Sequence, residues 1–166
     1  TKTLRFNVGF DPDSFDPQEC NTMEPAIILD QMYDFLYRET ETGDFVPSLA
    51  TGYTTNEDGT VYTFTLRDGI TFEDGTPITA NDVKFSWTRA LDPVNAFEYA
   101  YQLYYIKNAE AFNAGEATAD DLGLEVMRSY YQYDCDYIAL DANGIGVSIC
   151  DYLMADRYDP VYGQSY

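Results

Sequence analysis

Hydrophobic and polar positions alternate most clearly in the middle of the chain, where the pattern predicts a β-hairpin. Residues 61–66 read VYTFTL, a run of β-branched and aromatic residues that is typical of a strand. The turn at residues 56–59, with the sequence NEDG, separates this run from a second one at residues 52–55. A short further strand is expected at residues 70–72, between two glycine-containing turns.

Two other stretches space their apolar residues as helices do. Residues 25–37 open with a proline, which suits the first helical position, and residues 97–114 are closed by Gly115. Near the N-terminus, residues 3–8 alternate in the manner of a strand. Residues 9–17 follow as a loop, because they are rich in Asp-Pro turn signals.

A third predicted helix has a clear start and a clear stop. Thr79 is placed as its N-cap, and Asp82 three residues later approximates a capping box, with Asp in place of the usual Glu or Gln. The apolar face that follows includes Trp87, which we therefore interpret as a core residue and not as a ligand contact. An Asp-Pro pair at residues 92–93 ends the helix.

Composition and charge narrow the classes of function. The chain has 166 residues, 45% of them hydrophobic, which fits one domain or one domain plus a fragment of another. The net charge is −20, so the chain repels phosphate backbones and anionic lipid, and we expect no nucleic-acid partner. No run approaches the roughly 18 apolar residues of a membrane span, and we expect that any signal peptide has been removed.

Candidate chemistry is sparse. There is no histidine, which excludes Ser–His and Cys–His nucleophile pairs and His-ligated metals. Three cysteines, at positions 20, 135 and 150, allow one bridge between Cys135 and Cys150 or three buried thiols. Asp134 and Asp136, or residues 141–146 (DANGIG), resemble part of an EF-hand loop, but the bidentate Glu is missing, so we expect no metal site. With 29 acidic residues some carboxylate pair always exists, so an acid-pair hydrolase has no specific support.

The middle of the chain resembles a known family. Residues 47–50 (PSLA), 57–69 (EDGTVYTFTLRDG) and 72–83 (FEDGTPITANDV) are similar to the signature of the bacterial extracellular solute-binding proteins of family 5. These are the peptide, dipeptide and nickel receptors of ABC importers. Residues 15–17 (FDP) and residues 92–123 extend the likeness, in particular to the oligopeptide-binding branch. The resemblance covers residues 3–125.

The resemblance implies an α/β fold of the periplasmic-binding-protein type II kind, present here only in part. We expect one mixed sheet region and a small α+β extra lobe that carries the β-hairpin. Residues 1–37 would supply a strand and a helix of the base lobe, and residues 38–123 the extra lobe. Residues 124–166 form a Tyr-rich acidic segment that faintly resembles part of the opposite lobe. We expect the 166 residues to be too few to build both lobes.

Five candidate ligand contacts follow from the resemblance, each with an alternative. Asn21, Thr22 and Met23 would meet the peptide backbone at the cleft lip, or they form an ordinary loop. Tyr99 would cover a peptide side chain, or it packs in a Tyr-rich helix. Asp156 would pair with the peptide α-ammonium, or it is a solvated residue beside an arginine.

The function that the resemblance implies is non-covalent capture of peptides in an interlobe cleft and their delivery to an ABC importer. The implied partners are a peptide and the importer permease, with no cofactor and no enzymatic activity. The implied location is periplasmic or extracellular in a bacterium, with contact to the membrane only through a lipid anchor. The alternative is a surface interaction module on the same scaffold that has lost transport, with the Tyr-rich segment as its contact surface.

Overall fold

The computed structural model describes residues 2–5, 7–9, 11–12, 14–20, 23–128, 136–141, 158–159 and 164–165. The helices within these ranges are α1 (Met23–Met32), α2 (Ala80–Leu91), α3 (Ala109–Asn113) and the 3-10 turns η1 (Ala100–Leu103) and η2 (Ala119–Asp121). The strands are β1 (Tyr37–Glu39), β2 (Phe45–Pro47), β3 (Ala50–Thr55), β4 (Val61–Leu66), β5 (Leu124–Arg128), β6 (Asp136–Asp141), β7 (Tyr158–Asp159) and β8 (Gln164–Ser165).

A four-stranded sheet with the order β3-β4-β6-β5 forms the centre of the fold, and each of its pairings is antiparallel. The predicted hairpin of β3 and β4 is confirmed, with Thr55 opposite Tyr62 and Ala50 opposite Leu66. Along β4, buried and half-buried positions alternate, and Phe64 and Leu66 are each 3% exposed. This alternation follows from the two-residue side-chain period of a strand.

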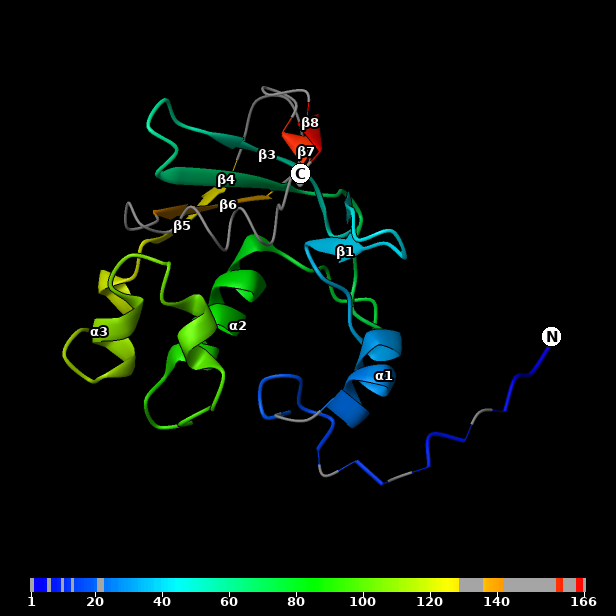
Figure 1. Cartoon of the computed structure of the whole chain (residues 1–166). Helices are drawn as coiled ribbons and strands as arrows, with labels where there is room; N and C mark the ends of the chain where they lie inside the picture. The colour runs from blue at the N-terminus through cyan, green and yellow to red at the C-terminus, as the bar shows by residue number, and fades with distance from the viewer. Residues whose placement is uncertain are drawn as a thin grey trace.

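Helices α2 and α3 lie on one side of this sheet, and the core fills the space between (Figure 1). The capping box predicted for α2 is confirmed, because the Asp82 carboxylate accepts from both the backbone N–H and the hydroxyl of Thr79 at 2.7 Å. At the other end of the helix Leu91 is fully buried. Trp87 packs against the core, as its place on the apolar face predicted.

A side-chain bridge ties α3 to the end of α2. The amide nitrogen of Asn113 donates to the carbonyl oxygen of Leu91 at 2.8 Å, and the hydroxyl of Tyr104 donates to the amide oxygen of Asn113 at 2.6 Å. The bridge satisfies one of the carbonyls that every helix leaves without an intrahelical partner at its C-terminus.

The helix predicted over residues 25–37 is too long. Helix α1 ends at Met32, and Tyr37 begins β1 instead. The backbone between them turns to meet the segment after β2, where the N–H groups of Ser48 and Leu49 donate to the carbonyls of Leu36 and Phe35 at 3.0 Å. These long-range bonds outweigh the helical spacing of the local sequence.

Three further predictions of elements are corrected. The helix predicted over residues 97–114 is two short pieces, η1 and α3, because Asn108 has the left-handed backbone (φ 63°) that interrupts a helix. The expected strand at residues 70–72 is a single bridge from Thr71 to Pro77. The described residues of the range 3–8 form no strand.

The first two strands after Gly123 belong to the same four-stranded sheet. Strands β5 and β6 pair with each other, and β6 also pairs with β4 from Val61↔Asp141 to Thr65↔Tyr137. The division into a base lobe, an extra lobe and a segment from the opposite lobe stays a prediction.

Candidate functional site

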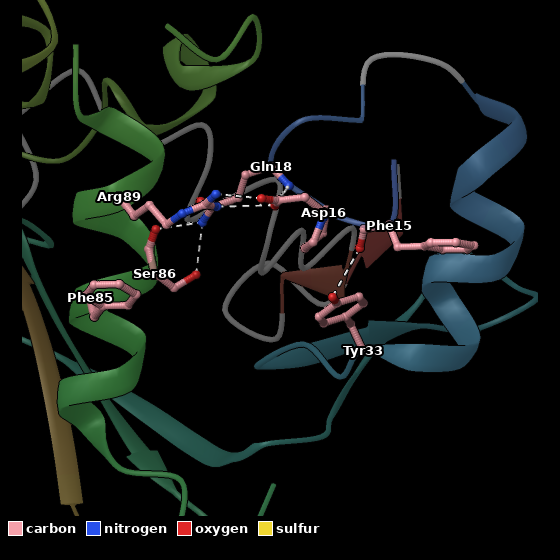
Figure 2. Close-up of a pocket in the computed structure, with 8 residues that line it drawn as sticks. Phe15, Asp16, Gln18, Tyr33, Phe85, Ser86 and Arg89 are labelled. Atoms are coloured by element: carbon pink, nitrogen blue, oxygen red, sulfur yellow. Dashed lines mark hydrogen bonds and ion pairs between the residues drawn. The ribbon is translucent and has the colours of Figure 1, made fainter. Parts of the chain in front are cut away.

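An open groove of about 520 Å³ lies between helix α2 and the loop that precedes α1 (Figure 2). Its lining residues are Phe15, Asp16, Pro17, Gln18, Tyr33, Phe85, Ser86 and Arg89. Three of them are aromatic, and Phe85 is 69% exposed. The groove is therefore lined both by aromatic side chains and by polar side chains that interact with one another.

An ion pair between Arg89 and Asp16 crosses the groove. The two guanidinium nitrogens meet the two carboxylate oxygens in a bidentate arrangement, at 2.5 Å for Nη2 to Oδ2 and 3.2 Å for Nη1 to Oδ1. The side chain of Arg89 is 35% exposed and that of Asp16 is 27% exposed. Partial burial and bidentate geometry make this pair stronger than an ordinary surface salt bridge.

Gln18 joins the same network from the loop. Its amide oxygen accepts from Arg89 Nη1 at 2.6 Å, and its amide nitrogen donates to the carbonyl and the hydroxyl oxygens of Ser86 at 2.7 and 3.1 Å (Figure 2). Both the donor and the acceptor of the Gln18 amide are thus used. The loop is fastened to two positions of α2 that lie one turn apart.

Electrostatics follow from this geometry. The hydrogen bonds from Arg89 hold the pKa of the Asp16 carboxyl below its ordinary value of 3.8, against a smaller opposing effect of desolvation. The same bond raises the pKa of Arg89. Both groups are therefore fully charged at neutral pH.

Two further contacts complete the surroundings of the groove. The guanidinium carbon of Arg89 lies 4.9 Å from the centre of the Phe97 ring, which is within the range of a cation–π interaction. On the opposite wall, the Tyr33 hydroxyl donates to the carbonyl of Phe15 at 3.1 Å (Figure 2). The loop is thus held by α2 on one side and by the residue that follows α1 on the other.

Residues 44–130, more than half of the chain, match the family model of the bacterial extracellular solute-binding proteins, family 5 Middle. The chain belongs to this family of solute-binding proteins. The resemblance noted in the sequence is therefore confirmed, and so is the partial fold of the periplasmic-binding-protein type II kind.

Among relatives of this family 5 protein, the oligopeptide-binding protein OppA of Bacillus subtilis (strain 168) is 39% identical over 125 residues, which cover 75% of this chain and 23% of the relative. The periplasmic murein peptide-binding protein MppA of Escherichia coli (strain K12) is 35% identical over 72% of this chain and 22% of its own length. The chain thus spans about a quarter of the length of these curated relatives.

Two solved structures extend the comparison. Haemophilus influenzae OppA, in complex with the peptide RPPGFSPFR, has a TM-score of 0.73 and 28% identity over 82% of this chain and 26% of its own. The E. coli murein tripeptide-binding protein MppA has a TM-score of 0.69 and 31% identity over 80% of this chain and 25% of its own. The described part of this family 5 chain therefore has the backbone of those proteins over most of its length.

The structure places only some of the predicted contacts. Tyr99 precedes η1, is 40% exposed, and has its ring 6.0 Å from that of Tyr101; it does not line the groove. Met23 is the first residue of α1. Asn21, Thr22 and Asp156 lie outside the described residues. The ligand roles of these five residues stay predictions.

Arg89 and Gln18 were not predicted from the sequence. One signal was present for Arg89: it is one of only 9 basic residues in the chain, and it lies beside the apolar face of the third predicted helix. Its partner Asp16 is 73 residues away, so no local spacing could pair the two. The described residues hold no group of three His, Cys, Asp or Glu that could bind a metal ion. The described helices are also too short or too polar to cross a membrane.

Proposed function

We propose that this chain is part of a bacterial receptor that binds peptides in an interlobe cleft outside the cytoplasm and delivers them to an ABC importer. The observation that carries the proposal is the match of more than half of the chain to family 5. It is supported by the names of the two relatives reported above, which are an oligopeptide-binding and a murein peptide-binding protein. The importer permease, a cell-surface lipid anchor and the absence of catalysis belong to the same proposal.

In this proposal the described part of the chain supplies one wall of the cleft. Tyr99 is the candidate contact whose side chain the structure describes, and its 40% exposure leaves part of the ring available to a ligand. An exposed aromatic ring covers a peptide side chain without selecting one type, which suits a receptor for varied peptides. Main-chain hydrogen bonds from elsewhere in the cleft would supply affinity that is independent of sequence.

The test is calorimetric titration of the protein made from its complete gene, with RPPGFSPFR and trialanine as probes and free arginine as the negative control. We expect 1:1 binding of at least one peptide and none of the free amino acid. Tyr99→Ala should weaken peptide binding about tenfold, which corresponds to about 1.4 kcal/mol.

The matched control is Tyr53→Ala. Tyr53 is 37% exposed, much as Tyr99 is, but it lies on β3. We expect this variant to bind as the wild type does at a temperature where both are folded. Failure of the wild type to bind any peptide, together with self-association that depends on protein concentration, would replace the receptor by the interaction module.

A further inference from the structure

Arg89 is the point at which three separate parts of the chain meet. Its guanidinium pairs with Asp16 and Gln18 of the loop that precedes α1, and its other side lies over the ring of Phe97. Phe97 comes two residues before Tyr99, the proposed ligand contact. The loop at residues 14–20 runs toward the start of α1, next in sequence to the other proposed contacts.

Helix α2 gives Arg89 a rigid base. The capping box fixes the first turn of the helix, and the burial of Leu91 fixes the last one. The carbonyl of Arg89 itself accepts a hydrogen bond from the amide of Asn95 at 3.0 Å, which orders the backbone between α2 and Phe97.

The loop depends on α2 for much of its placement. Within the loop, Ser14 donates to Glu19 at 2.6 Å, and the N–H of Glu19 donates to the carbonyl of Asp16 at 3.1 Å. These bonds shape the loop but do not orient it. Its orientation comes from the bonds of Asp16 and Gln18 to α2 and from the bond between Tyr33 and Phe15.

We propose that Arg89 is a positioning residue that couples the loop at residues 14–20 to the segment at residues 97–103, so that these two parts of one cleft wall keep a single arrangement. The role in peptide binding rests on the proposed function, whereas the coupling itself does not. Arg is suited to the role because its planar fork binds a carboxylate through two parallel hydrogen bonds while its flat face stacks on a ring, whereas a Lys ammonium is compact and not planar.

The coupling is tested by hydrogen exchange of the Arg89→Met variant of the protein from its complete gene. We expect amides in both segments to exchange about tenfold faster, while those of β3 and β4 keep the wild-type rate. Arg89→Lys keeps the positive charge but lacks the planar guanidinium. We expect its exchange rates in both segments to lie between those of the wild type and those of Arg89→Met, and this variant replaces Arg89→Met if the latter does not fold.

Arg38→Met is the matched control. Arg38 also pairs with an aspartate, Asp34, and also lies near a ring, that of Phe35 at 5.9 Å, but all three residues belong to one short stretch. We expect its loss to leave both segments unchanged. Unchanged exchange of residues 97–103 in Arg89→Met would overturn the coupling, whatever the protein binds.

The role in binding is tested with the same peptides at a temperature where every variant is folded. We expect Arg89→Met and Asp16→Asn each to weaken binding about tenfold, and the double variant to be no weaker than the worse single one, because the two residues act as a unit. The core variant Ile70→Val should lower the melting temperature without changing affinity.

Each outcome separates the two proposals. If Arg89→Met shows faster exchange but binds peptide with wild-type affinity, the positioning role is overturned and the receptor proposal is unaffected. Faster exchange in a protein whose wild type binds no peptide would sustain the coupling and refute the receptor. If the losses of affinity in Arg89→Met and Asp16→Asn add up in the double variant, the two residues do not act as a unit.

Discussion

Replacing Leu91 by alanine tests whether the core that supports α2 is packed as the structure indicates. Leu91 is fully buried at the last position of the helix and belongs to the cluster formed by β4, α2 and α3. The substitution removes about three buried carbon groups, and each contributes about 0.8 kcal/mol of transfer free energy. The cavity left behind adds to this, so the free energy of unfolding should fall by about 3–4 kcal/mol.

The measurement is urea unfolding followed by the fluorescence of Trp87, which is the single tryptophan of the chain and packs against the core. With a slope of about 2 kcal/mol per molar urea, the midpoint of Leu91→Ala should fall by about 1.5–2 M at an unchanged slope. The control is Val94→Ala, three residues further on and 88% exposed. It should change the free energy of unfolding by less than about 0.5 kcal/mol.

A loss of less than about 1 kcal/mol in Leu91→Ala would refute this packing, because surface sites respond on that scale. An altered slope would instead mean that the variant no longer unfolds in one step, or that its compactness has changed.

Two further predictions follow from hydrogen bonds. Asn113→Ala should lower the free energy of unfolding by about 1–3 kcal/mol, because it leaves the Leu91 carbonyl without its amide donor. Asn113→Asp also lacks that donor, so urea unfolding at pH 7 should show a similar loss of free energy. Because the folded-state pKa of Asp16 is lowered, its pairing with Arg89 stabilises the fold above the ordinary pKa of 3.8 and is lost as the pH falls through the folded value. Urea midpoints of Asp16→Asn should therefore fall less steeply with acidification than those of the wild type, and parallel curves would contradict the ion pair.

Local chemistry explains which elements could be predicted from the sequence. The hairpin follows from a strand pattern on both sides of an Asn-Glu-Asp-Gly turn, in which the Asn56 side chain accepts from the N–H groups of Thr60 and Val61 at 2.8 and 3.0 Å and Gly59 takes a positive φ of 66°. The start of α2 follows from Thr79 and the carboxylate three residues later. Each of these signals is complete within a few residues.

The elements that could not be predicted depend on distant partners. Tyr37 has helical spacing in the sequence, but β1 exists because it pairs with β2, and Tyr37 lies opposite Pro47. The candidate site behaves likewise: the sequence placed Asp16 in a turn and in the FDP match to the family, and its ion pair appears only once α2 brings Arg89 to it across 73 positions. Sequence patterns describe short-range preferences, whereas these contacts are set by tertiary packing.

The strand order β3-β4-β6-β5 also has a consequence for how the chain is made. Strand β4 sits inside the sheet, yet its neighbour β6 comes about 80 residues later, with Val61 paired to Asp141. The β3–β4 hairpin closes within microseconds, but at about 5–20 residues per second a ribosome needs about 4–16 s more to deliver β6. During that interval the nascent chain carries an edge of β4 whose backbone N–H and C=O groups have no strand partner, which is the kind of surface that chaperones bind and that aggregation begins from.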